Sequence, residues 1–286
     1  MTPRASATVW LGPVNLAQVG ASVIPGAPAT AVTCTGDGSP SCSQIAESWS
    51  GAGGRKLPSL LAQKGLPAGS VIAAGAFSAG GSILKRLCLN QADRAQLAVV
   101  HSADADYESS RGADGQPIPT EGYVLYAIEA LTDPDKLFVA TASSNPNKTY
   151  GSGIEVLAST RREIERRTGR SFQLGGVLPG VTPQPAKLYQ LGNVWMAEFP
   201  TIPHGQHATL LAPQVWQGLI LPWLAGGPGP EPGGGGGPGP AEPPPEPPPP
   251  MAAKPGLGWE HALAAIAGLA LGYGGVALYQ KRARRA

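Results

Sequence analysis

The sequence predicts an α/β fold: a mostly parallel sheet with helices on both faces. Two observations favour it. Short apolar runs of strand length recur along residues 1–224, and segments with helical periodicity lie between them, an alternation that is typical of βαβ units. The apolar runs are also nearly continuous rather than alternating, as expected for strands buried on both faces.

The expected strands are apolar runs bounded by turn-forming residues. In chain order they are Ala7–Leu11, Val71–Ala74, Leu97–Ala103, Leu137–Ala142 and Gly192–Phe199. Residues 20–54 are rich in Gly, Ala, Ser, Thr and Pro. We expect this stretch to be irregular apart from a short helix around Ser43–Trp49.

The expected helices follow apolar positions three and four residues apart. They are Leu57–Lys64 closed by Gly65, a helix through Ile83–Cys88 that Asn90 ends, Gly122–Leu131, Ile154–Arg167, and a last helix that ends near Trp223 and Leu224. The arginines of 154–167 are expected to form a solvated face, with Glu163 and Arg167 paired at i,i+4.

Composition excludes some classes of function. The net charge is only +2 and the basic residues are scattered, so no nucleic-acid partner is expected. No CxxC pair and no His cluster with metal-ligand spacing is present, so neither a metal nor another cofactor is expected. Cys34 and Cys42 bracket a short loop that a disulfide could close in an oxidising compartment, whereas Cys88 is expected to be packed as an apolar residue.

The chain changes character after the predicted domain 1–224. Residues 225–257 are dominated by Gly and Pro, which predicts a disordered linker with polyproline II stretches. Segment 258–280 contains an uncharged run from Ala262 to Tyr279, which at about 1.5 Å per residue spans roughly 27 Å. We expect a single transmembrane helix there, followed by a basic tail at 281–286; a helix that docks on a protein assembly is the alternative.

The side of the membrane is not decided by the sequence. The basic tail favours the cytoplasm for the C-terminus and the outside for the domain, yet residues 1–20 do not resemble a secretory signal. Gly268 and Gly272 form a GxxxG pair suited to helix-mediated self-association.

The strongest functional signal is the stretch from Ser70 to Cys88. An apolar strand leads into the turn Gly75-Ala76-Phe77-Ser78-Ala79-Gly80-Gly81, and a helical pattern follows. This is the context of a nucleophile elbow, in which a serine sits on a strained turn between residues that must be small. The usual motif has Gly two residues before the serine, so Ala76 is a mild departure. A Gly-rich loop with a surface serine is the alternative interpretation.

A nucleophilic serine needs a base, and the base needs an acid to orient it. His101 falls within an expected buried strand and His261 next to the apolar C-terminal run. His204 and His207 follow the last strand, and we choose His204 first because it lies in the loop proper. The other would then be an ordinary polar surface residue.

The acid is expected in the loop after Leu97–Ala103, with Asp104 first and Asp106 second. The loop after Leu137–Ala142 carries Ser143 and Ser144 but no carboxylate. The oxyanion hole is expected to use the backbone amide of Ala79 and a donor near Val14 or Asn15, although the Asn15 side chain could instead cap a turn.

These motifs, in the order Ser…Asp…His, make residues ~7–224 resemble the α/β-hydrolase superfamily, in particular its small esterases and cutinases. The resemblance implies cleavage of a small-molecule or lipid-like ester through an acyl-enzyme on Ser78. A peptidase or amidase would use the same triad. A non-catalytic hydrolase-like scaffold for binding or assembly at a membrane is the hypothesis from a different class.

Overall fold

The computed structural model of the protein describes residues 4–20, 22–35, 40–49, 51–106, 111–144 and 151–227. By its internal contacts the chain divides into two units, Met1–Gly235 and Gly236–Ala286. All of the described residues belong to the first unit. The predicted transmembrane helix at 258–280 and the tail at 281–286 lie outside the described residues, as does all of the predicted linker except 225–227, so these stay predictions.

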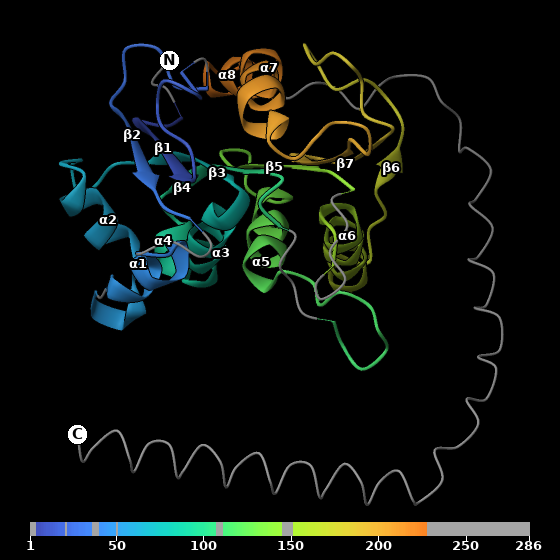
Figure 1. Ribbon diagram of the computed structural model, residues 1–286, viewed down its shortest axis with the longest axis horizontal. Coiled ribbons are helices and arrows are strands. Elements are labelled where there is room, and N and C mark those ends of the chain that lie inside the picture. The colour runs from blue at the N-terminus through green and yellow to red at the C-terminus, as the bar shows by residue number, and fades with distance from the viewer. Residues whose placement is uncertain are drawn as a thin grey trace, which may run out of the picture. The chain divides into compact units, whose positions relative to one another are not determined.

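One eight-stranded sheet forms the centre of the described domain, in the order β2-β1-β3-β4-β5-β8-β7-β6 (Figure 1). The pairs from β2 across to β8 are parallel, and the last two pairs, β8 with β7 and β7 with β6, are antiparallel. The strands are β1 (Ala7–Gly12), β2 (Ala29–Thr33), β3 (Ile72–Phe77), β4 (Leu97–Ala103), β5 (Leu137–Ala142), β6 (Gln173–Leu174), β7 (Lys187–Leu191) and β8 (Val194–Glu198). The prediction of a mostly parallel α/β sheet is confirmed.

Helices cover both faces of the sheet, as Figure 1 shows. One face carries α1 (Cys42–Ser48), α2 (Leu57–Gln63), α3 (Gly81–Leu89), α4 (Gln91–Arg94), α5 (Glu121–Ala130) and α6 (Gly153–Thr168). The other carries the C-terminal helical segments η3 (His207–Leu211), α7 (Ala212–Val215), η4 (Trp216–Ile220) and α8 (Leu221–Leu224). Two short 3₁₀ segments, η1 (Ala52–Gly54) and η2 (Ser78–Gly80), complete the list.

Each face of the sheet has its own hydrophobic core. The core beneath α1–α6 contains Leu84, Leu87 and Phe138, and the core beneath α7 and α8 contains Trp10 and Trp216. Trp10 also explains why residue 75 of β3 is a glycine. A Cβ added to Gly75, its partner on β3, would lie 2.7 Å from the indole ring, so a larger residue there would displace Trp10.

The C-terminal helical segments contain two π-helical stretches, η3 and η4. Pro213 and Pro222 are each the second residue of the α-helical turn that follows one of these stretches. Proline lacks the N–H that an α-helix would use four residues back, and a local π-helical widening accommodates that loss.

Three strands were not expected from the sequence. The interpretation of residues 20–54 as irregular was wrong at β2, where only Val32 is fully buried. Because β2 lies at the sheet edge, its residues show neither a buried run nor a clear alternation. The antiparallel strands β6 and β7 were also missed, and β6 is only two residues long.

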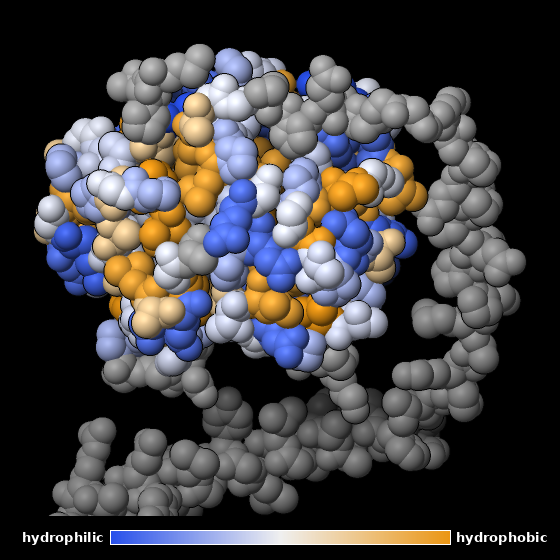
Figure 2. All heavy atoms as spheres, turned by 90° about the horizontal axis from the view of Figure 1, so that it is seen from above, coloured by the Kyte–Doolittle hydropathy of each residue, from blue (hydrophilic) through white to orange (hydrophobic). Residues whose placement is uncertain are grey.

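The surface of the domain is mixed in character. Seen from the side of α7 and α8, hydrophobic residues lie in several patches between hydrophilic ones (Figure 2). Among the helices of the described ranges, none combines the length and the hydropathy that crossing a membrane requires.

Candidate active site

Ser78 lies at a sharp junction between a strand and a helix. β3 ends at Phe77, Ser78 opens the 3₁₀ turn η2, and α3 continues from Gly81. Ser78 has a φ of 53°, and among the residues that the structure describes Asp104 is the other one besides glycine with a positive φ. A side chain in this left-handed region is strained, and such strain gathers at functional sites. The backbone of Ser78 therefore has the left-handed φ and the strand-to-helix setting that a nucleophile elbow requires.

The residues two and three after Ser78, Gly80 and Gly81, are glycines because neighbouring backbone comes very close. A Cβ on Gly80 would lie 2.1 Å from the carbonyl oxygen of Leu11, and one on Gly81 would lie 1.8 Å from that of Ala105. The elbow is therefore clamped between the end of β1 and the loop after β4. Ala76, the departure from the usual motif, is fully buried in β3, and its methyl group is accommodated there.

Asp104 directly follows β4 and leans across to the neighbouring strand β5. Its φ is 48°, and its backbone N–H donates to the carbonyl oxygen of Thr141 at 2.7 Å. The carboxylate accepts two hydrogen bonds from Ser143, from the backbone N–H to Oδ1 at 2.9 Å and from the hydroxyl to Oδ2 at 2.5 Å. Its third partner is His204, whose Nδ1 lies 2.6 Å from Oδ2.

The first turn of α6 closes this carboxylate site. A Cβ on Gly153 would lie 2.5 Å from Oδ1 of Asp104, and Ile154 N–H donates to the carbonyl oxygen of Ser143 at 3.1 Å. The positive end of the helix dipole therefore lies beside the acid. Burial raises the pKa of Asp104, but the hydrogen bonds from His204 and from Ser143 outweigh burial, so the net pKa is lowered. Asp104 is thus held as a carboxylate.

His204 lies in the loop between β8 and η3, and two contacts fasten the start of this loop to β5 and the residues after it. Phe199 N–H donates to the carbonyl oxygen of Ala142 at 2.8 Å, and the Ser144 hydroxyl donates to that of Pro200 at 2.9 Å. The imidazole of His204 stacks on the ring of Phe77, the residue before Ser78, so it lies next to the elbow. When Nδ1–H donates to Asp104, the basic lone pair is on Nε2.

Asp106, the second choice for the acid, has a different environment. Its Oδ1 accepts a short hydrogen bond from the hydroxyl of Thr120, the N-cap residue of α5. Burial raises the pKa of Asp106 to about 6, against the lowering effects of Thr120 and Lys85. Asp106 is therefore bonded to the start of α5, whereas Asp104 is bonded to Ser143 and to the imidazole of His204.

His207, the second choice for the base, begins η3 and is completely buried. Its Nδ1 lies 3.3 Å from the Thr141 hydroxyl, and its ring meets that of Phe199 edge-on at 6.0 Å. Burial lowers the pKa of His207 to about 4. The expectation that the histidine not chosen would be a polar surface residue was therefore wrong, because the first turn of η3 directs this side chain into the core.

His101 is buried in β4, as expected. Its Nδ1 accepts a hydrogen bond from the Trp216 indole at 3.0 Å, and burial lowers its pKa to about 3. Cys88 is buried and unbonded, also as expected.

The candidate oxyanion donors lie on two segments that approach each other. Ala79 is in η2, directly after Ser78. Val14 N–H donates to the carbonyl oxygen of Gly12 at 2.8 Å, and would have to leave that bond to serve an oxyanion. Asn15 exchanges hydrogen bonds with Gln18, so its side-chain oxygen caps a turn. The roles of Ala79, Val14 and Asn15 in an oxyanion hole stay predictions.

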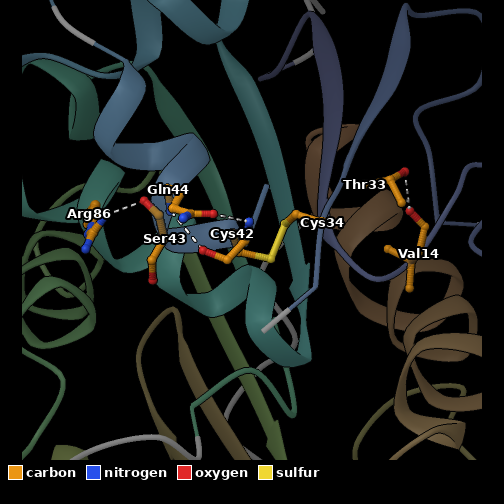
Figure 3. Close-up of a disulfide and its surroundings, with 8 residues drawn as sticks. Val14, Thr33, Cys34, Cys42, Ser43, Gln44 and Arg86 are labelled. Atoms are coloured by element: carbon orange, nitrogen blue, oxygen red, sulfur yellow. Dashed lines mark hydrogen bonds between the residues drawn. A yellow bond between two sulfur atoms is a disulfide. The ribbon is translucent and has the colours of Figure 1, made fainter. Parts of the chain in front are cut away.

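A disulfide between Cys34 and Cys42 braces the loop near Gly12 (Figure 3). Cys34 N–H donates to the carbonyl oxygen of Gly12 at 3.1 Å, and the Thr33 hydroxyl donates to that of Val14 at 3.2 Å. On the other side of the bridge, Arg86 of α3 donates to the carbonyl oxygen of Ser43 at 2.9 Å. The bridge thus ties the end of β1 and the elbow helix into one frame.

Three residues of this site were not singled out from the sequence: Phe77, Ser143 and Gly153. Ser143 was noted only because its loop lacks a carboxylate. A serine directly after a buried strand, followed by a capped helix, was the available signal. Within the described ranges, no group of three or more His, Cys, Asp or Glu side chains is placed to hold a metal ion.

Comparisons with known proteins add little to this geometry. No protein-family model matches the chain, and no curated protein matches it. Among solved structures, the chain is similar to one described as the crystal structure of the gene lin2722 products from Listeria innocua. The two are 11% identical with a TM-score of 0.39, and the match covers 77% of this chain and 94% of the other. A similarity at this level carries no functional argument.

Proposed function

We propose that the domain is a serine hydrolase that cleaves an ester through an acyl-enzyme intermediate. The observation that carries the proposal is the 2.6 Å contact between His204 Nδ1 and Asp104 Oδ2, which joins residues 100 positions apart beside an elbow serine. In this proposal Ser78 is the nucleophile, His204 is the general base and Asp104 orients the imidazole.

The chemistry follows from these roles. Ser78 Oγ attacks the carbonyl carbon of the ester while its proton moves to Nε2 of His204. The oxyanion is stabilised by the N–H of Ala79, aided by the helix that begins at the elbow. The intermediate then expels the alcohol, which takes the proton from His204. A water molecule, deprotonated by the same imidazole, releases the acid and restores Ser78.

Two measurements test the proposal on the full chain. A fluorophosphonate should label Ser78, and the protein should hydrolyse p-nitrophenyl esters of graded chain length. Ser78→Ala and His204→Ala should abolish both. Asp104→Asn should lower kcat by about 10³- to 10⁴-fold, because Asn favours the wrong imidazole tautomer. Intact folded protein that is neither labelled nor active would refute the enzyme and leave a binding module. Matched anilides separate ester from amide cleavage.

We further propose that the domain acts while tethered to a membrane through 258–280 and that it meets lipid-like esters there. The Cys34–Cys42 bridge supports an oxidising compartment for the domain. Protease protection of the intact chain in sealed vesicles would test the side of the membrane. Digestion only from the compartment that keeps thiols reduced would contradict the proposal.

A further inference from the structure

Phe77 directly precedes the candidate nucleophile Ser78, and its ring stacks on the candidate base His204. It is the last residue of β3, its side chain is 7% exposed, and it packs in the core beneath α7 and α8. Its ring centroid lies 4.7 Å from that of His204, with the two planes inclined by only 27°. The imidazole is therefore held along one edge by Asp104 and on one face by Phe77.

The three described histidines differ in how they meet aromatic rings. Trp10 meets His101 at 78° and Phe199 meets His207 at 88°, both edge-on. Burial lowers the pKa of both of these imidazoles, so they are neutral near pH 7. His204 is 25% exposed and is stacked face to face instead.

A stacked face has a specific consequence for a base. The π face of a benzene ring is negative, and it attracts a cation within about 6 Å of its centroid. A neutral imidazole gains less from that contact than an imidazolium does. The stack therefore favours the state in which His204 has taken the serine proton, which is the state next to the transition state.

We propose that Phe77 is a positioning residue for the reaction: it fixes the plane of the His204 ring relative to Ser78 and stabilises the imidazolium that forms there. The inference rests on the proposed function. Because Phe77 and Ser78 are adjacent in the elbow, one rigid segment sets the nucleophile and the ring against which its base lies. Fixing the two groups on one segment matters because displacing reacting groups by even about 1 Å can lower the rate of catalysis about 100-fold.

Three variants of the full chain test this inference. Phe77→Leu removes the π face, and Phe77→Tyr retains it. Phe138→Leu is the matched control, since Phe138 is 1% exposed and belongs to the core on the opposite face of the sheet. We expect Phe77→Leu to lower kcat about 3- to 30-fold with KM within about twofold of the unaltered protein. Phe77→Tyr should have the kcat of the unaltered protein. Phe138→Leu should lower Tm about as much as Phe77→Leu does but leave kcat unchanged.

A spectroscopic signature that does not need activity accompanies the kinetics. The ring current of Phe77 should shift the His204 ring protons upfield in the unaltered protein and in Phe77→Tyr. The shift should vanish in Phe77→Leu and persist in Phe138→Leu.

The outcomes separate the two proposals. If the protein is labelled and active but kcat of Phe77→Leu equals that of Phe138→Leu, the role of Phe77 is refuted while the hydrolase stands. A loss that Tyr fails to restore, or one confined to KM, also refutes it. If the unaltered protein is folded but neither labelled nor active, both the hydrolase proposal and the role of Phe77 are refuted, even if the ring-current shift is present.

Discussion

A single methyl group at Gly153 should separate helix stability from catalysis. Gly153 is the first residue of α6, where helix propensity alone predicts that Ala stabilises the protein by up to about 1 kcal/mol. The structure predicts the opposite. The new Cβ would lie 2.5 Å from Asp104 Oδ1, whereas ordinary contacts are 3.4 Å or longer, so the carboxylate would have to retreat by about 0.9 Å.

That displacement would disturb a carboxylate that is held by three hydrogen bonds. Both bonds from Ser143 and the 2.6 Å contact with His204 Nδ1 would lengthen together. We expect Gly153→Ala to lower kcat by about 10- to 100-fold, which is typical of displacements near 1 Å in an active site. Weakening hydrogen bonds to a buried charge should also lower the free energy of unfolding by about 1–2 kcal/mol after the gain in helix propensity.

The assay is ester hydrolysis together with urea unfolding, and Gly69→Ala is the control. Gly69 has a negative φ and open space around it, so a methyl group there should change neither kcat nor stability. A Gly153→Ala protein with unchanged kcat and unchanged or increased stability would refute the reasoning. It would mean that the position of Asp104 is not set by α6, or that Asp104 is not the orienting acid.

Four further predictions concern stability. Ser143→Ala should raise the pKa of Asp104 in the folded protein. The lowered pKa of Asp104 stabilises the fold at pH values above its pKa in the unfolded chain, and this stability is lost as the pH falls through its pKa in the folded protein. Acid unfolding of Ser143→Ala, monitored by fluorescence, should therefore occur at higher pH. At pH 5, unfolding should take up about one proton: His101 and His207, with pKa values of about 3 and 4, each gain about one, and Asp106, with a pKa of about 6, releases about one. Asp106→Asn should raise that uptake to about two, and the slope of unfolding free energy against pH measures both. Removing the Cys34–Cys42 bridge by a double Ser substitution should cost about 2–3 kcal/mol in urea unfolding, given a separation of only 8 residues. Asp93→Ala should cost about 1–3 kcal/mol by the same method, because it leaves the amides of Lys56 and Leu57 without their buried acceptor, while Arg55 keeps its hydrogen bonds to Gln96 and Ala92.

Much of the parallel part of the fold could be predicted because its strands are buried on both faces. β3, β4 and β5 are buried throughout and appear in the sequence as mostly apolar runs. β2 could not be found in this way, since its burial comes from β1 on one side only. The position of Ser78 was predictable for a local reason: the strand, the small residues and the helix are contiguous.

The sequence ranked Asp104 before Asp106 and His204 before His207, but it could not show how the environments of each pair differ, because these depend on backbone direction. Asp104 and Asp106 are two residues apart, and the left-handed φ of Asp104 directs its carboxylate toward β5 while Asp106 contacts the start of α5. His204 and His207 differ in a similar way, because the backbone N–H of His207 already donates to the carbonyl oxygen of His204 in the first turn of the helix. No local pattern of residue types encodes such directions.

The missing carboxylate after β5 has a physical explanation in this geometry. The end of β5 is where Asp104 lies, held by Thr141 and by both donors of Ser143. A second carboxylate at residue 143 would place two like charges in contact there and remove the hydroxyl donor. The loop after β4 therefore supplies the carboxylate, and the loop after β5 supplies the hydrogen bonds that keep it charged. The same division explains why Ser143, rather than an acidic residue, follows the strand that leads to α6.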